Sequence, residues 1–437
     1  MGQKARGFAR ATSVRSDVDR SEEDCGRFSR RLLALALAGA VLRVAYLLSQ
    51  QPTPISSDAI YYRSNARFLL DGRGFLNPVT FTPSAAHPPA WSIALALPQG
   101  LGFDSQLSHQ LFAGFVGTLS VILIALAARA VAGPRVGLVA AAIATVYPNL
   151  WLHERTLLSE VLVLPLVALA IWMAYRYLAR PRAGLAAALG FLVGLLALTR
   201  PELVVLVAAL LVPLVLLAGR STVGLRRRLV WVLVGAGVTA ATILPWTAYS
   251  SARSEHPVFL STNFGSTAYV ANCPGAYEGE HLGAINPKCW GDLYRRTTKG
   301  DGSSIDIKLR GLAIKYARDN LGRVPIVLAA REGRTWDVYR PFQQNHLDAQ
   351  FDKTEVWVYD LALFSYWLLL PAAIAGVVVL RRRHVPVFVL LSFGVVVVIA
   401  TAITLGQTRI RTPAEVPIVI LAAVGIDAAC RMMRHSR

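Results

Sequence analysis

Charged residues are scarce in this chain. Asp, Glu, Lys and Arg make up 16% of its 437 residues, whereas 54% of the residues are hydrophobic. Soluble globular domains carry about 25% charged residues, so this composition excludes an ordinary soluble protein. It predicts a chain that is embedded in a membrane.

Several common chemical signatures are also absent. The sequence contains no Walker-type or dinucleotide-binding glycine motif, no CxxC pair, no HExxH helix and no nucleophile elbow. It has four cysteines, and two of them, Cys273 and Cys289, lie in one long polar segment where a disulfide between them is left open. No internal repeat is evident, which weakens a transporter interpretation because many transporters are built from repeats.

Long apolar runs are what the chain has instead. A helix needs about 20 apolar residues to cross roughly 30 Å of hydrocarbon. The predicted spans run 32–50, 108–131, 134–150, 157–178, 183–199, 201–218, 229–250, 359–380, 385–404 and 413–431. The apolar stretch 90–102 is shorter and is interrupted by Pro98 and Gly100, so we expect a helix at the membrane interface or a re-entrant segment.

The formal net charge of +19 would indicate a nucleic-acid partner if the basic residues clustered on a soluble domain. They lie instead at alternate span ends, in groups such as 226–228 and 381–383. The acids Asp58, Glu154 and Glu202 fall at the opposite ends. This pattern predicts cytoplasmic termini and excludes nucleic acid as the reason for the high charge.

Four zones follow from the spans. Residues 1–31 form a cytoplasmic arm, and the span that follows shows no clear cleavage site and is treated as a retained anchor. Residues 32–250 form a transmembrane core with an external loop at 51–106. Residues 251–357 form an external segment, read as a small mixed domain or cap, and residues 358–437 form the last spans and a cytoplasmic tail. In the external loop, Ser57 is expected to cap a helix at 58–70, and in the external segment residues 305–320 have helical spacing.

Four motifs lie on the expected external side of the core. They are Ser57-Asp58-Ala59-Ile60-Tyr61-Tyr62 with Asn65 to Gly72, His87-Pro88-Pro89, Leu198-Thr199-Arg200-Pro201-Glu202, and Arg409-Ile410-Arg411-Thr412-Pro413. In order and sidedness they resemble the GT-C membrane glycosyltransferases, in particular the branch with the protein O-mannosyltransferases and the aminoarabinose transferase that modifies lipid A.

The resemblance implies an all-α integral membrane fold of GT-C type, with about ten transmembrane helices, external juxtamembrane helices and an external cap. It implies transfer of a monosaccharide, with inversion, from a polyprenyl-phosphate donor to an acceptor on the outer face of the plasma membrane. The acceptor would be a cell-envelope glycan, a glycolipid or a protein. A donor carried by lipid agrees with the absence of a nucleotide-binding motif.

By this resemblance Asp58 matches the catalytic base, which takes a proton from the acceptor hydroxyl. The alternative is an acid in the first turn of a helix, where it offsets the helix dipole by ~0.3–1 kcal/mol. Many relatives carry a second acid directly after this position, where this chain has Ala59. Any paired-acid role is therefore open.

Basic residues match the donor-phosphate site. The candidates are Arg200 and one of the pair Arg411 and Arg409, with Arg411 as the first choice and Arg409 as the second. They lie on the side that basic residues otherwise avoid, and the geometry of a guanidinium group suits phosphate. The alternative for Arg200 is a side chain that snorkels at the interface. His87 is read either as a contact to the donor or as a turn residue before Pro88 and Pro89.

Further residues are candidates for donor or acceptor binding, with packing or ion pairing at the interface as the alternative. They are Tyr61, Tyr62, Glu154, Arg155, Trp336, Tyr339 and Arg340. A divalent metal ion near Asp58 is left open, with Glu154, His256 and His346 as helpers, because no ligand spacing is diagnostic.

Two other functions account for the same spans. A transporter or flippase of a lipid-linked saccharide would need ionisable groups near the middle of several spans, and this sequence keeps most of them at the ends. A noncatalytic subunit of an envelope assembly is the second alternative. The sequence does not identify the sugar, the acceptor or the linkage.

Overall fold

The chain folds into a bundle of helices with a helical cap at one end. The computed structural model describes residues 2–49, 55–218, 220, 223–296 and 300–435. The larger helices are α1 (Gly2–Ser49), α2 (Ser57–Leu70), α3 (Ala90–Gly100), α4 (Gln106–Ala132), α5 (Pro134–Val146), α7 (Glu160–Ala179), α8 (Ala183–Ala197), α10 (Leu225–Ser251), α17 (Val356–Arg382), α18 (Phe388–Ile403) and α19 (Thr412–His435).

The remaining elements, among them the 18-residue α14, complete the bundle and the cap. They are η1 (Pro148–Leu150), α6 (Leu152–Thr156), η2 (Pro201–Val205), η3 (Val207–Leu211), α9 (Val212–Leu217), α11 (Phe264–Ala271), α12 (Pro274–Tyr277), α13 (Pro287–Arg296), α14 (Gly302–Asp319), η4 (Leu321–Arg323), α15 (Val324–Thr335), α16 (Pro341–Asp352) and η5 (Thr408–Arg411). Within the described residues the nearest thing to a sheet is one isolated bridge between Leu76 and Pro83.

The prediction of an all-helical membrane fold is confirmed. In the part of the chain that the structure describes, six helical stretches are long and apolar enough to cross a membrane: 26–49, 106–132, 160–179, 225–251, 356–382 and 408–434. Helix α5 and the η1–α6 segment form a pair bent by 84°, so residues 134–150 do not form one straight helix. The remaining predicted spans correspond to the shorter apolar helices 183–197, 201–217 and 388–403.

Small residues let the helices of the bundle approach closely. A side chain at Gly376 of α17 would collide with the backbone of Leu421 in α19, and one at Gly190 of α8 would collide with the backbone of Gly235 in α10. Close backbone approach of this kind is typical of membrane helices, which gain little from hydrophobic burial against one another. These contacts fix the bundle that positions the cap.

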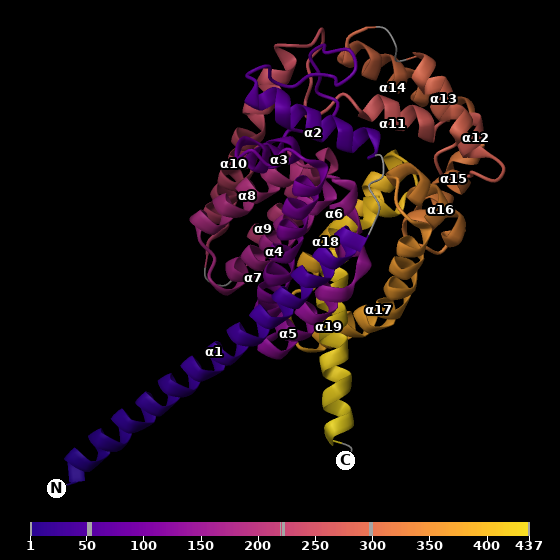
Figure 1. Ribbon diagram of the computed structural model, residues 1–437. Helices are drawn as coiled ribbons and strands as arrows, with labels where there is room; N and C mark the ends of the chain where they lie inside the picture. The colour runs from indigo at the N-terminus through magenta and orange to yellow at the C-terminus, as the bar shows by residue number, and fades with distance from the viewer. Residues whose placement is uncertain (1, 50–54, 219, 221–222, 297–299, 436–437) are drawn as a thin grey trace.

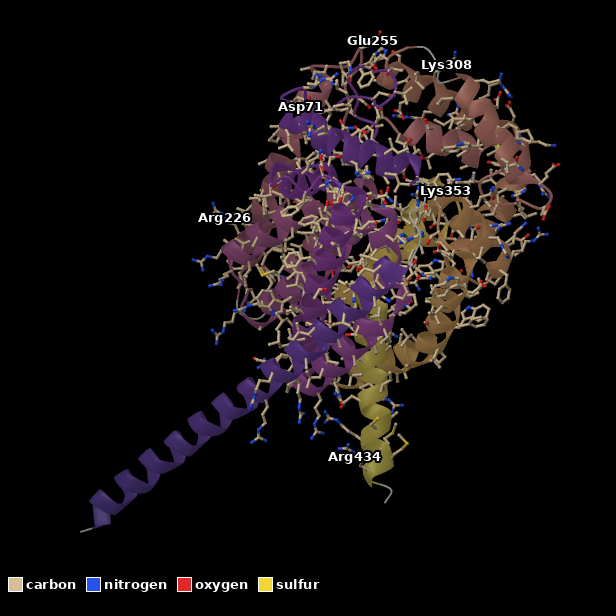
Figure 2. All side chains as sticks on the ribbon, viewed as in Figure 1. Asp71, Arg226, Glu255, Lys308, Lys353 and Arg434 are labelled. Carbon is tan, nitrogen blue, oxygen red and sulfur yellow. A yellow bond between two sulfur atoms is a disulfide. The ribbon has the colours of Figure 1, made fainter. Side chains whose placement is uncertain are left out.

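We call one end of the bundle the cap end; it carries α2, α3 and residues 252–355. Figure 1 shows α2, α11 and α14 there, and both termini at the opposite end. Figure 2 labels Asp71, Glu255 and Lys308 at the cap end and Arg434 at the other. Helix α1 begins at Gly2 and continues to Ser49, so no break in secondary structure marks residue 31.

Local details of the cap end agree with the sequence in part. The helix expected from residue 58 begins at Ser57, and its N-cap is Ser56, whose side chain accepts a hydrogen bond from the Ala59 backbone; the expectation of Ser57 as the cap was wrong. The expected helix at 305–320 is α14. Cys273 and Cys289 form a disulfide.

Candidate active site

Asp58 lies in the first turn of α2, where it faces the start of the last long helix. Its Oδ2 accepts a hydrogen bond from Nη1 of Arg409 at 3.0 Å. Two turns further along α2, the Asn65 side chain pairs with both the backbone N–H and the carbonyl of Leu76, at 2.8 and 3.0 Å. This clamp holds the loop that follows α2 against the helix, and so fixes the position of the carboxylate.

Arg409 comes from η5, the short turn that leads into α19. Its Nε donates to Oε1 of Gln407 at 3.0 Å, and its guanidinium lies over the Phe351 ring, 5.3 Å from the centroid. The Asp352 carboxylate lies 4.0 Å from Nη1. Arg409 therefore stands between two carboxylates, Asp58 and Asp352, that belong to different parts of the chain.

His87 is the second neighbour of Asp58. Its Nε2 lies 3.6 Å from Oδ1 of Asp58, and its ring lies 5.0 Å from the ring centroids of both Tyr61 and Tyr62. Tyr61 donates from its hydroxyl to the Ser84 carbonyl at 3.3 Å. The three predicted residues His87, Tyr61 and Tyr62 are thus brought together with Asp58.

Burial and charge act in opposite directions on these groups. Burial raises the pKa of the Asp58 carboxyl, but the positive charge that His87 carries when it is protonated and the Arg409 guanidinium lower that pKa by more, so it lies below its ordinary value. Burial lowers the pKa of His87 despite the nearby Asp58 carboxylate. Burial also raises the pKa of Tyr61 to about 12. At neutral pH the site therefore presents an ionised carboxylate, a neutral imidazole and a protonated phenol.

Arg200 follows α8 on the same side of the bundle. It pairs with Glu160 and, through Nε at 2.5 Å, with Glu202. The charge of Arg200 contributes to the lowered pKa of Asp58. Among the described residues, the Nη2 nitrogens of Arg200 and Arg409 have no hydrogen-bond partner. Each guanidinium thus keeps donors for a further anion.

Asp352, with Asp348 one turn before it on α16, was missed in the sequence. Both carboxylates are buried, and burial raises the pKa of Asp352 to about 7 and that of Asp348 to about 6. Asp352 accepts a hydrogen bond from the Tyr359 hydroxyl at 2.6 Å and lies 4.0 Å from Nδ1 of His153. Two acids at i and i+4 in a short helix were the available signal.

Arg411 lies in different surroundings from Arg409. It is 1% exposed, and it pairs with Asp337 and with Glu415 at 2.6 Å each. Its guanidinium also lies 3.8 Å from the centroid of the Tyr366 ring. Within the described residues it makes no contact with Asp58 or Arg409. The two arginines of the motif 409–413 therefore differ: Arg409 contacts Asp58, and Arg411 belongs to a buried ion-pair network.

The other candidate residues have partners elsewhere. Glu154 is buried and pairs with Arg43 at 2.8 Å, and Arg155 pairs with Glu355 at 3.1 Å. Trp336 donates to Glu332, and Arg340 donates to the Glu280 carbonyl and lies over the Tyr339 ring. None of these named partners is Asp58.

The side chains around Asp58 do not fit a metal ion. The expected helper Glu154 is held by Arg43, and in the described residues no three His, Cys, Asp or Glu side chains form a group that could hold a metal. One oxygen of Asp58 is already engaged by a cation, Arg409. We therefore assign no step to a metal.

Comparisons with known proteins bear on the fold of the chain. Residues 86–249, which include His87 and Arg200, match the family model described as dolichyl-phosphate-mannose-protein mannosyltransferase. The Archaeoglobus fulgidus oligosaccharyltransferase, in a complex with zinc and sulfate, is similar in structure with a TM-score of 0.55 and 14% sequence identity, over 93% of this chain and 50% of that one. The chain has the GT-C fold.

Further matches bear on the extent of the similarity. The same archaeal enzyme, tethered to an acceptor peptide, matches with a TM-score of 0.55 and 15% identity over 94% of this chain and 50% of that one. ArnT from Cupriavidus metallidurans, bound to undecaprenyl phosphate, matches with a TM-score of 0.41 and 15% identity over 90% and 77% of the two chains. This GT-C chain spans about half the length of the archaeal enzyme. No curated protein sequence matches it.

Proposed function

We propose that the chain is an inverting glycosyltransferase that transfers a monosaccharide from a polyprenyl-phosphate donor to an acceptor hydroxyl. The observation that carries the proposal is the pairing of Asp58 with Arg409 at 3.0 Å, with Arg200 and His87 on the same side of the bundle. A carboxylate beside guanidiniums with unused donors supplies both groups that the reaction requires. The archaeal structure that was solved with an inhibitory peptide and a dolichol phosphate supports a donor of this class.

In the proposed reaction Asp58 accepts the proton of the acceptor hydroxyl as the oxygen attacks the anomeric carbon. The new bond joins this oxygen to the anomeric carbon, while the bond from that carbon to the phosphate oxygen breaks. The leaving electron pair stays on the phosphate, where Arg409 and Arg200 stabilise it. Attack from the side opposite the phosphate inverts the anomeric configuration.

The proposed topology places the cap end outside the plasma membrane, because the basic clusters lie at the opposite end. In this arrangement residues 32–250 and 358–437 form the membrane core, and 251–357 form the external cap. Acceptors of the proposed class are an envelope glycan, a glycolipid or a protein. Residues Tyr61, Tyr62 and His87 are proposed to contact the donor sugar or phosphate, since they surround Asp58.

Replacement of the proposed base tests the function. Asp58→Asn keeps the size of the side chain and a hydrogen-bond acceptor for Arg409 but removes the proton acceptor. We expect transfer from a panel of polyprenyl-phosphate sugars, including mannose and arabinofuranose, to envelope material to fall at least 10³-fold, roughly the upper range for general base catalysis. Asp71→Asn is the matched control, because Asp71 ends the same helix and pairs with Arg67 at the surface.

Two results would contradict the proposal. Transfer by purified Asp58→Asn protein at the wild-type rate would show that Asp58 is not the base. Translocation of a lipid-linked sugar across reconstituted vesicles, without any glycosidic product, would favour the flippase alternative. Mass spectrometry of envelope glycans and glycoproteins with and without the gene would identify the transferred sugar.

A further inference from the structure

A cavity of about 370 Å³ opens at the cap end beside the Asp58–Arg409 pair. Its walls come from residues 55–57 at the start of α2, residues 285–290 at the start of α13, the side of α16 between residues 344 and 353, and Gln407. A cavity of this size lies in the range of small-molecule sites in proteins. None of these elements except α2 was expected from the sequence to contribute to the site.

Three features connect the cavity with the Asp58–Arg409 pair. Ser57 in its wall directly precedes Asp58, Gln407 accepts a hydrogen bond from Arg409, and the ring of Phe351 lies beneath the Arg409 guanidinium. The lining residues include none of the recorded partners of Arg200. A ligand in the cavity would thus approach Asp58 from the cap and not from the side of Arg200.

One wall of the cavity is aromatic. Trp290 and Phe351 meet edge to face with ring centroids 5.4 Å apart, and Trp290 is 40% exposed. A half-exposed indole that lines a cavity presents a flat apolar surface. The C–H face of a sugar ring packs on such a surface while its hydroxyls point away from it.

The remaining lining combines the apolar side chains of Ile55, Ile285, Pro287 and Leu347 with three side-chain amides. Gln407 is only 3% exposed, and its Nε2 has no hydrogen-bond partner among the described residues. Gln350 is exposed at the rim, and Asp348 lies buried beside Gln344, which donates to it at 2.8 Å. Amides both donate and accept hydrogen bonds, so they match neutral hydroxyls better than a phosphate or a carboxylate.

The position of the cavity disfavours two other occupants. An extended peptide often binds by addition to a sheet edge, and the described chain offers no strand at this cavity. An isoprenoid chain requires access from the hydrocarbon, but α13 and α16 are not among the helices long and apolar enough to span a membrane. The lining also includes Lys353, whose ammonium group can donate hydrogen bonds to sugar hydroxyls.

We propose that this cavity binds a sugar ring of a carbohydrate acceptor, stacked on Trp290 and hydrogen-bonded to Gln407 and Gln350, so that one ring hydroxyl reaches Asp58. The proposal rests on the proposed function and specifies its acceptor as a glycan or the glycan part of a glycolipid. Trp290 and Gln350 would be binding residues and not catalytic ones.

Saturation-transfer NMR on the full-length protein in nanodiscs tests the proposal without a transfer assay. The probes are methyl α-D-mannopyranoside, methyl β-D-glucopyranoside and methyl α-L-arabinofuranoside, compared with an acetylated threonine tripeptide and farnesyl phosphate. We expect at least one glycoside to give a signal that falls about fivefold or more in Trp290→Ala and about threefold in Gln350→Ala. Trp357→Ala is the matched control, since Trp357 is a similarly exposed tryptophan on α17 outside the cavity.

The outcomes separate this proposal from the proposed function. Glycoside binding that persists in Asp58→Asn while transfer is lost supports both. Trp290-dependent binding together with full transfer by Asp58→Asn supports the cavity and overturns the assigned base. The cavity proposal is overturned if no glycoside gives a Trp290-dependent signal, or if only the peptide or farnesyl phosphate gives one.

Discussion

Arg409 and Arg411 are two residues apart, and their surroundings predict opposite effects when each is replaced by Gln. Arg411 is enclosed by Asp337, Glu415 and the ring of Tyr366. Arg411→Gln leaves two buried carboxylates without their cation, and removal of one partner from a buried pair costs about 3–5 kcal/mol. We expect a large loss of stability in this variant, with any loss of activity following from it.

The side chains of Arg409 and Asp58 are each 18% exposed. Loss of their ion pair should therefore cost about 1–2 kcal/mol of stability, a value between those of surface and buried ion pairs. In the proposed mechanism Arg409→Gln also removes a charge-assisted hydrogen bond to the leaving phosphate, worth about 1.5–3 kcal/mol. Loss of about 1.5–3 kcal/mol of transition-state stabilisation lowers kcat/KM about 10- to 150-fold. We therefore expect a folded protein with much weaker transfer.

Thermal unfolding in detergent and initial transfer rates measure the two effects on the same preparations. Arg409→Lys is the control that keeps the charge but loses the planar fork, and it should lie between Gln and wild type in rate. The reasoning is refuted if Arg411→Gln unfolds at the wild-type temperature and is inactive while Arg409→Gln keeps its rate. That result would return the phosphate contact to Arg411.

Two further predictions concern the cap. Burial raises the pKa of Asp352 from 3.8 to about 7, so between these values the folded state binds a proton that the unfolded state releases. As the pH rises from about 4 to 7, the free energy of unfolding should therefore fall by up to about 4 kcal/mol. Asp352→Asn should unfold at a temperature that depends less on pH between about 4 and 7, and an unchanged dependence would exclude Asp352 as its source. The Cys273–Cys289 disulfide joins residues 16 apart, so Cys273→Ser with Cys289→Ser should destabilise the protein by about 3 kcal/mol. Unfolding of the oxidised wild type at the same temperature as the double variant would contradict this estimate.

The fold could be predicted from the sequence because its causes are local. A run of apolar residues long enough to cross the hydrocarbon is visible in one window of the sequence, and each of the ten predicted segments corresponds to an apolar helical stretch. The 84° bend after α5 was not predicted, although Pro148 lies at it. A helix break and a helix that continues share the same hydrophobicity, so composition alone does not distinguish them.

The candidate site could be predicted only in part because its contacts are distant in sequence. Asp58 and Arg409 are 351 residues apart, and the turn at η5 decides which arginine of the motif faces Asp58. The spacing of Asp348 and Asp352 could have marked α16 as a candidate, but it does not indicate that Asp352 lies near Arg409, which is far along the chain. For Glu154 the alternative of an ion pair was weighed, but its partner Arg43 lies in the first span, far along the chain.

One guanidinium serves two purposes in the proposed mechanism, and this links the base to the donor. While Arg409 donates to Asp58, it helps to hold the pKa of that carboxyl below its ordinary value, which makes the carboxylate a weak base. A donor phosphate that draws Arg409 toward itself relieves this effect and leaves burial to raise the basicity of Asp58. The acceptor hydroxyl would then meet a competent base only when the donor is bound. Arg409→Gln removes this link, so in the pH profile of kcat/KM for the donor, which reports the donor-free enzyme, the acidic limb should lie at higher pH than that of wild type, and coincident limbs would contradict it.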